Sequence, residues 1–591
     1  MDDSIELLFQ DLYGTPSEKV AAVTQVASLC KDHRVLEHVV HHNQLMSAFA
    51  RLLEEDSNAE MSFIIGKVLL AISKFEDFHE MLAKHRIGVI ILRAIELELK
   101  RAEYRLETKS SGHRALTNRQ EHFLFVCLSI LVNLAGNVAT LRKMVKKGLV
   151  PIVVGCLEKK SAKSLMISLR LLKLSSIFEE TAVEIANQGH SVIPQLARML
   201  NAQRVNIQSD VISILFNLSF LDQCLDLISH QEVHNFLVDN LHEEELYPHA
   251  VCLVYHLSSK QENRQQFFAA GISEYLIKAM KTAKKQKMTK ALAGLLVNMT
   301  LHPLCAEYFF RNCAADFVMY TLHDEPHFDF AKQVLLKVAR NMSAWSQSLQ
   351  YKIANALEVQ ELTCLVGHVK DPASYIDMAQ HRSLYWEQNF WSAHVSFLWN
   401  CTFQCKNEDI VVELVGILNN MTIDDLPAGN HWHNLMEEYN SNMMQFLKRI
   451  LDPNDGSESS CCDDLKLEVI VWLSELSADK ECSCWLVNIL DYVNRIFTQS
   501  FKDYEMSIEI LYFYEQLLLH EETRFQVIGG DGVIDAILRC LEEGYSLGIA
   551  AAKCLILIED LDRNHDGSMG EVGCYLREKR FLLEKTDEVD S

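Results

Sequence analysis

Proline and glycine are both scarce in this sequence, with 9 Pro and 22 Gly among 591 residues. Proline interrupts helices and glycine weakens them, so their scarcity favours helices over turn-rich sheets. The chain is far too long for one ordinary globular core, although 49% of its residues are hydrophobic and only 23% are charged. This is the composition of a folded chain, and a repeat array escapes the size limit because each repeat packs only on its neighbours.

An excess of positive charge is also missing, because the formal net charge is −24. Phosphate binding requires a positive field, so nucleic acid is excluded as the default partner. Long apolar runs are lacking as well: the stretch from Phe123 to Ala135 contains Ser129 and Asn133 and is too short to span a bilayer. The first residues do not resemble a signal peptide, so we expect a cytosolic protein with no direct membrane insertion and mostly reduced, buried Cys.

Motifs for catalysis or metal binding are absent or incomplete. No Walker-type phosphate loop and no Gly-x-Ser-x-Gly elbow occurs, so we expect neither an enzyme nor a cofactor. The segment Asp562 to Gly567 resembles the start of a calcium loop, but Gly573 stands where a bidentate Glu is needed, and a helix–helix turn is the alternative. Cys461-Cys462 and Cys482-x-Cys484 lack zinc-ligand spacing and are interpreted as reduced thiols.

What the sequence does contain is a short phrase that recurs about every 40 to 44 residues, with one double-length gap and one stretched gap. Its clearest copies are Leu131-Val132-Asn133-Leu134-Ala135, Leu215-Phe216-Asn217-Leu218-Ser219, Leu296-Val297-Asn298-Met299-Thr300, Ala339-Arg340-Asn341-Met342-Ser343 and Leu418-Asn419-Asn420-Met421-Thr422. Weaker copies are Leu172 to Ser175, Val254 to Ser258 and Leu473 to Ser477. This period is typical of armadillo and HEAT arrays, whose long surfaces serve binding.

The sequence therefore predicts an all-α, armadillo/HEAT-like, right-handed superhelical solenoid of about a dozen repeats. One helix ends with Gly148 and the next begins near Pro151, and the same pattern recurs at Gly189 through Pro194, at Gly271-Ile272 and at Gly530 to Val533. We place the array at residues 1–577 and a charged tail at 578–591. A charged insertion at about 96–120, a weakly periodic stretch from Asp371 to Trp391 and an acidic loop at about 452–464 interrupt the array.

The Asn of the phrase is predicted to be structural rather than a contact residue. A buried Asn amide can tie its helix by hydrogen bonds to the preceding interhelical loop. We assign this role to Asn133, Asn217, Asn298, Asn341 and Asn420. Four of these Asn, together with Asn400, also form Asn-x-Ser/Thr sequons, but glycosylation requires a secretory route and an exposed loop.

A cluster of lysines stands out against the acidic chain and comprises Lys278, Lys281, Lys284, Lys285, Lys287 and Lys290. One interpretation is a solvated helix end. The other is a docking site for an acidic partner segment, because electrostatic steering requires a local field opposite to the global one. The sequence leaves both open.

Several segments, in the same order along the chain, resemble one family, the kinesin-associated proteins. They are Ile5 to Asp11, Phe78-His79, Ile87-Gly88, Glu98 to Arg101, Asn217 to Phe220, Tyr255 to Ser258, Asn420 to Leu426, Leu467 to Ile470, His520, Thr523-Arg524 and Lys579 to Phe581. Both ends and the charged insertion are shorter than is usual in that family. We therefore expect any change of function to concern contacts housed there, such as those with specific cargo, and not the array.

The resemblance implies a non-catalytic adaptor that grips the tails of two different kinesin motor chains and holds cargo, or intraflagellar transport particles, elsewhere. It implies a cytoplasmic, cytoskeleton-associated protein of cilia or flagella. The alternatives are a generic armadillo scaffold in signalling and a nuclear-import adaptor. Import adaptors line their groove with repeated Trp and Asn pairs, and here only Trp399-Asn400 resembles such a pair.

Overall fold

The structure, a computed structural model, describes residues 2–55, 58–108, 117–158, 162–187, 192–201, 204–282, 288–312, 330–355, 390–421, 432–452, 462–499, 503–530, 532–541 and 545–564. All regular secondary structure within these ranges is helical, and no strand occurs in them. The prediction of an all-α array is therefore confirmed. The chain divides into two compact units, Met1–Ile272 (unit 1) and Ser273–Ser591 (unit 2).

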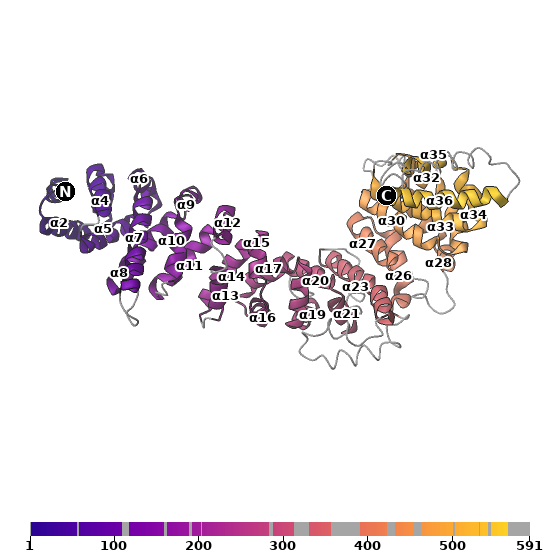
Figure 1. Ribbon diagram of the computed structural model, residues 1–591, viewed down its shortest axis with the longest axis horizontal. Coiled ribbons are helices and arrows are strands. Elements are labelled where there is room, and N and C mark those ends of the chain that lie inside the picture. The colour runs from indigo at the N-terminus through magenta and orange to yellow at the C-terminus, as the bar shows by residue number, and fades with distance from the viewer. Residues whose placement is uncertain are drawn as a thin grey trace. The chain divides into compact units, whose positions relative to one another are not determined.

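Unit 1 is a series of helices joined by short turns, and helices that are close in sequence are also close in space (Figure 1). Its elements are α1 (Asp2–Asp11), α2 (Pro16–Leu29), α3 (His33–His41), α4 (Asn43–Glu55), α5 (Ala59–Ser73), η1 (Glu76–Phe78), α6 (His79–Lys84), α7 (Ile87–Thr108), α8 (Asn118–Leu134), α9 (Val138–Val145), α10 (Leu149–Glu158), α11 (Ala162–Ser175), α12 (Glu179–Asn187), α13 (Val192–Met199), α14 (Val205–Leu218), α15 (Asp222–Ile228), α16 (Gln231–Asp239), α17 (Tyr247–Leu257) and α18 (Gln261–Ala269).

Unit 2 continues the same pattern, and α19 begins on the last residue of unit 1. Its described elements are α19 (Ile272–Thr282), α20 (Lys290–Thr300), α21 (Pro303–Arg311), α23 (Phe330–Asn355), α26 (Phe390–Gln404), α27 (Glu408–Asn419), α28 (Trp432–Glu438), α29 (Asn440–Leu451), α30 (Asp463–Leu476), α31 (Lys480–Leu486), η4 (Val487–Ile489), α32 (Leu490–Gln499), α33 (Tyr504–Leu519), α34 (Glu521–Ile528), α35 (Val533–Cys540) and α36 (Tyr545–Asn564).

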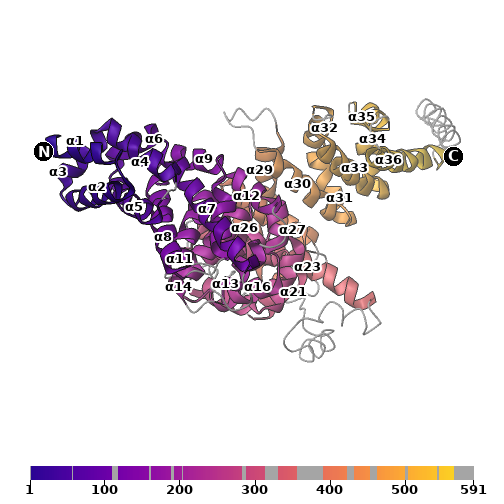
Figure 2. The same ribbon diagram turned by 60° about the vertical axis from the view of Figure 1, so that its left-hand side comes forward.

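One helix of each repeat packs on its counterparts in the repeats before and after it. We call these the spine helices. They are α2, α5, α8, α11, α14 and α17 in unit 1, and α20, α23, α27, α30, α33 and α36 in unit 2. Figures 1 and 2 show α33 and α36 side by side from two directions. The recurring phrase lies at the C-terminal end of most of these helices and in the middle of α23, so its period is the period of the stack.

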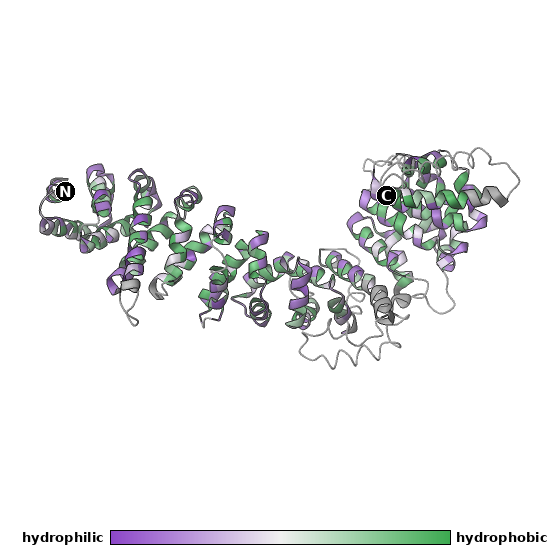
Figure 3. Cartoon of the chain, viewed as in Figure 1, coloured by the Kyte–Doolittle hydropathy of each residue, from purple (hydrophilic) through white to green (hydrophobic). Residues whose placement is uncertain are grey.

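The sequence of a spine helix explains both its start and its packing. Helix α8 begins with a capping box, in which the Thr117 hydroxyl accepts from the Gln120 N–H and the Gln120 side chain accepts from the Thr117 N–H. Apolar residues then occupy several sides of the helix, and Cys127, Leu128 and Leu131 are completely buried. A helix that touches α5 on one side and α11 on the other needs this wide apolar surface. Figure 3 shows apolar residues gathered where helices face one another.

In the described part of the double-length gap, the spine passes directly from α23 to α27. Helix α23, which carries Asn341, packs directly on α27, whose C-cap is Asn420. Helix α26 lies between them in sequence but packs on α27 and α29 outside the spine. The stack therefore continues across the gap. Most of the weakly periodic stretch predicted from Asp371 to Trp391 lies outside the described residues.

The charged segment at 96–120 is helical in its first part. Residues 96–108 form the second half of α7, residues 109–116 lie outside the described residues, and α8 starts at Asn118. Glu98 is only 7% exposed and accepts a 2.6 Å hydrogen bond from the Gln120 amide. The segment is thus tied to the following spine helix. The acidic loop and the tail at 578–591 fall largely or wholly outside the described residues.

The Gly pattern marks the left-handed turns between the first and second helices of three repeats. Gly148, Gly271 and Gly532 have φ angles of 89°, 89° and 75° and directly precede α10, α19 and α35. An L-residue in this region places its Cβ close to the backbone carbonyl, whereas glycine avoids that clash. The sequence prediction of helix breaks at these residues agrees with the structure.

We expect Gly148→Ala to lower the free energy of unfolding by about 1 kcal/mol. Nothing lies within 4 Å of the added Cβ, so the cost would come from the backbone alone. The matched control is Gly88→Ala inside α7, where the nearest atom to the new Cβ is 3.7 Å away and φ is ordinary. That control should be neutral or stabilising, because alanine is a better helix former. Denaturant melts with the same sign of change for both variants would contradict this account.

Candidate protein-interaction surface

The phrase Asn joins each spine helix to the end of the spine helix before it. The Asn side-chain N–H donates to a hydroxyl one repeat back, at 2.9 Å from Asn133 to Ser73, 2.8 Å from Asn217 to Ser176, 3.0 Å from Asn341 to Thr300 and 3.0 Å from Asn420 to Ser343. Three of the four also reach a backbone carbonyl of the preceding repeat. These bonds span 60, 41, 41 and 77 residues of sequence.

Each accepting hydroxyl is itself held by its own helix. Ser176 donates to the Lys173 carbonyl at 2.8 Å, and Ser343 donates to the Arg340 carbonyl at 2.8 Å. A hydroxyl has one proton and two lone pairs, so donating inward leaves a lone pair free to accept from the next Asn. The Asn and the hydroxyl therefore form one hydrogen-bonded joint per repeat, which we call the rung.

Two of the rungs in the described part of the chain lack the Asn, and in each the residue that replaces it matches its partner in polarity. Where the hydroxyl position carries Ala135, the next repeat carries Leu174 in place of Asn. At another rung the Asn is replaced by His256, whose Nδ1 lies 2.7 Å from the Ser219 hydroxyl. Burial lowers the pKa of His256, which favours the neutral ring at this joint. The rungs described here are therefore polar on both sides, except the apolar pair of Ala135 and Leu174.

One detail of the Asn prediction is wrong, because the side chains of the five phrase Asn are half-buried rather than buried. The predicted location of the partners holds only in part. Ser176 lies in the turn after α11, as predicted, whereas Ser73 and Thr300 are the last residues of α5 and α20 and Ser343 lies within α23.

The spine of unit 2 has a charged network that sequence reasoning missed. Arg340 of α23 forms ion pairs with Glu413 of α27 and Glu468 of α30, and Lys337 lies 3.4 Å from the Glu413 carboxylate. Asn419 donates to the Glu468 carboxylate at 2.9 Å. The network joins three successive spine helices, including the pair that spans the sequence gap. No local signal predicts it, because its members lie up to 128 residues apart.

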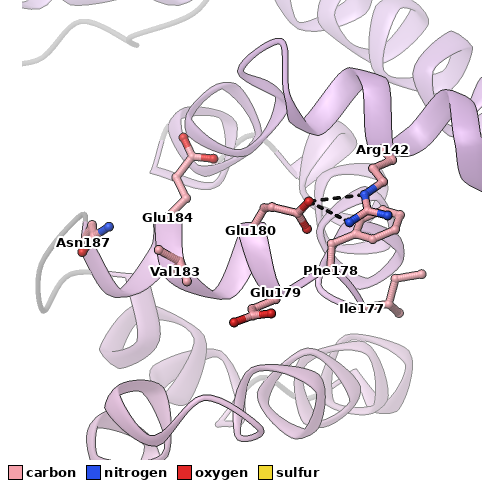
Figure 4. A pocket seen from close by; sticks show the side chains of 8 residues that line it. All are labelled: Arg142, Ile177, Phe178, Glu179, Glu180, Val183, Glu184 and Asn187. Carbon is pink, nitrogen blue, oxygen red and sulfur yellow. Dashed lines mark hydrogen bonds and ion pairs between the residues drawn. The ribbon is translucent and has the colours of Figure 1, made fainter.

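Unit 1 has two adjoining hollows at the turns that follow α11 and α14. The larger is about 810 Å³ and is lined by Arg142 of α9, the turn residues Ile177 and Phe178, and one face of α12 (Figure 4). The smaller is about 510 Å³ and extends past Asn217 to Phe220. The apolar residue directly after the hydroxyl is exposed in three repeats, at Ile177, Phe220 and Leu301. Aligning the phrases could have revealed this position.

The lysine cluster is only partly described. Lys278 on α19 and Lys290 at the start of α20 are exposed, and Lys281 lies in the last turn of α19. Lys284, Lys285 and Lys287 lie outside the described residues. Both interpretations of the cluster therefore stay open.

No group of His, Cys, Asp or Glu in the described part of the chain is arranged to hold a metal. Asp562 and Asn564 lie within α36, so the segment interpreted as the start of a calcium loop or as a turn begins as helix, and the rest of it falls outside the described residues. Cys482 is buried whereas Cys484 is exposed, so this pair cannot face one ion. Most of the described Cys are buried, as expected, and Cys462 and Cys484 are exposed.

Trp399 does not line a groove as an import adaptor would require. It is completely buried in unit 2, stacked on Trp432 at 6.1 Å between ring centroids and edge-on to Trp472 at 5.3 Å. Asn400 accepts a hydrogen bond from Gln404 on its own helix. The Trp–Asn pair is therefore part of a core, which removes the one sequence feature that favoured nuclear import.

Stacked helices joined by rungs define an armadillo-like repeat protein. A chain from a solved structure, whose title concerns the interaction between cadherin and β-catenin, is similar in fold with a TM-score of 0.58. It is 13% identical, and the match covers 95% of this chain and 99% of that one. A crystal structure of an engineered protein matches 80% of this chain and 98% of its own with 14% identity, at a TM-score of 0.48.

The sequence itself matches the family described as Kinesin-associated protein (KAP), over residues 1–378 and 374–532. The chain belongs to this family, which confirms the resemblance found in the sequence. It is a kinesin-associated, armadillo-like adaptor in general terms. None of the described helices has the length and apolar character needed to cross a membrane.

We expect Asn217→Leu to cost about 1–3 kcal/mol of unfolding free energy, because the buried Ser176 hydroxyl loses its partner. Adding Ser176→Ala should recover part of this loss. The double variant copies the Ala135 and Leu174 combination that the chain already uses one repeat earlier. A double-mutant cycle by chemical denaturation measures the coupling. Additive effects would mean that the rung contributes no pairwise stabilisation.

Arg340→Met removes the guanidinium and should lower the free energy of unfolding by about 2–4 kcal/mol. The reason is that the carboxylate of Glu413 is buried and would keep only Lys337 as a cationic partner. The matched control is Lys480→Met, which breaks the exposed pair between Lys480 and Glu522 in the same unit. That change should cost only about 0–1 kcal/mol. Equal shifts of the denaturation midpoint would show that the network of Arg340 is no stronger than a surface pair.

Proposed function

We propose that this protein is a non-catalytic adaptor that binds the tails of two different kinesin motor chains and links them to cargo. It would act in microtubule plus-end-directed transport, in the cytoplasm and in association with the cytoskeleton, and in intraflagellar transport within cilia. The observation that carries the proposal is the match to the kinesin-associated family over residues 1–378 and 374–532. The armadillo-like fold supports it physically, because a solenoid offers a long surface that engages an extended or helical segment at several points.

Within this function, the segment Lys278–Lys290 would steer an acidic part of a motor tail. Support comes from its charge, which is opposite to that of the chain as a whole, and from the exposure of Lys278 and Lys290 at its two ends. Single exposed pairs contribute little, about 0–1 kcal/mol each. A cluster acts together on the association rate, because its field extends over about a Debye length.

Reversing Lys284, Lys285 and Lys287 together to Glu should slow the association of purified motor tails and flatten the dependence of that rate on salt. The matched control reverses Lys143, Lys146 and Lys147, which are exposed in unit 1 and give the same change in net charge. It should have a smaller effect. Stopped-flow association at two salt concentrations measures both. If the two triple variants behave alike, the Lys278–Lys290 segment is a solvated helix end.

The wider proposal is tested by pull-down from ciliated cells followed by mass spectrometry. Recovery of two motor heavy chains with the full-length protein supports it, and binding should survive deletion of residues 582–591. Recovery of proteins with basic import signals and no motor chain would contradict it.

A further inference from the structure

The rim of unit 1 carries a surface that stacking does not explain. We call it the α12 edge; it consists of Ile177, Glu179, Val183 and Glu184 together with Phe220, around the two adjoining hollows. In Figure 4, Glu180 is paired with Arg142 near the start of α12, and Val183 and Glu184 project further along the helix, away from that pair. The hollows share Ile177, Phe178 and Glu179, so they adjoin each other.

Its apolar side chains are accessible to solvent. Ile177 is 58% exposed, Phe220 is 66% exposed and Val183 is 39% exposed. Leaving apolar area in water costs about 25 cal/mol per Å², so a partner that covers these three side chains gains free energy. Exposed apolar residues gathered around a depression are typical of an interaction site.

The charge of the α12 edge is acidic and only partly compensated. Arg142 donates to the Glu180 carboxylate at 2.9 Å and 3.3 Å. No ion pair joins Glu179 or Glu184 to a cation among the residues that the structure describes. Partial burial raises the pKa of Glu184, and an approaching cation would lower it again.

Helix α34 in unit 2 provides an internal comparison. Glu521 and Glu522 begin it as Glu179 and Glu180 begin α12, and Glu522 is paired with Lys480 as Glu180 is paired with Arg142. The later positions differ. Gln526 stands where α12 has Glu184, and Arg524, where α12 has Ala182, donates to the carbonyls of Leu518 and Leu519. Leu519 and Phe525 stand where α12 has Ile177 and Val183, and they are exposed as well, at 49% and 56%. The carboxylate of Glu184, and not apolar exposure, therefore distinguishes α12 from α34.

We propose that the α12 edge docks a helical segment of a partner protein that presents Lys or Arg one turn away from an apolar side chain. The cation would approach Glu184 and Glu179, and the apolar side chain would cover Ile177 and Val183. Complementary charge selects this partner over an acidic or purely apolar one. The proposal does not depend on where motor tails bind, because the residues of the α12 edge all belong to unit 1 and are argued from their own exposure and charge.

The test begins with selection from a library of random linear peptides displayed on phage. The target is the full-length protein, and the library is first depleted on the Glu179→Gln/Glu184→Gln variant. Peptides that survive are synthesised with a fluorescent label, and their dissociation constants are measured by anisotropy. The substituted side chains are at least partly exposed, so the variants should fold, and circular dichroism melts check this. Glu184→Gln alone copies Gln526 of α34 and serves as the mildest variant.

We expect the selected peptides to carry Lys or Arg three or four positions from an apolar residue. Their affinity should fall about tenfold for Glu179→Gln/Glu184→Gln, since each charge pair contributes up to about 1 kcal/mol. Ile177→Ser should weaken binding to a similar degree, and the matched control Glu521→Gln should leave it unchanged. Absence of selective peptides, peptides without basic residues, or equal loss with Glu521→Gln would each overturn the proposal.

Discussion

Each spine helix has to bury apolar side chains against the spine helices on both sides of it, and the rest of the structure follows from this constraint. A single amphipathic face would leave one neighbour without a partner surface. Helix α8 therefore carries buried residues around most of its circumference, from Leu124 through Cys127 to Leu131. The other helices of each repeat pack around this stack and need only one apolar stripe. Stability then depends on nearest neighbours, which lets a chain of 591 residues fold without one large core.

The rungs add direction to this non-directional packing. Apolar contact tolerates small shifts between helices, whereas a hydrogen bond from Asn217 to the Ser176 hydroxyl exists at one register only. Because each hydroxyl also bonds its own helix, the joint has two partners and little freedom. The rung between Asn420 and Ser343 shows its value most clearly, since it aligns α27 on α23 although 77 residues separate the two side chains.

The surfaces left for binding are those that the stack cannot use. Turns after the spine helices expose Ile177 and Phe220 because no helix of the next repeat covers them. Glu179, Glu180 and Glu184 of α12 line the hollow beside these turns, and among the described residues only Glu180 forms an ion pair with an arginine.

The all-α class, the period of the stack, the helix breaks at Gly148, Gly271 and Gly532, and the family could all be read from the sequence. These features are local or repeated, so each copy reports the same constraint. Tertiary structure alone decided that the stack runs directly from α23 to α27, that Trp399 is buried, and that Arg340 meets Glu413 and Glu468. The grouping of exposed apolar side chains and carboxylates at the α12 edge is likewise visible only in the tertiary structure. Each of these depends on contacts between side chains from distant segments, and spacing along one chain does not specify which segments come together.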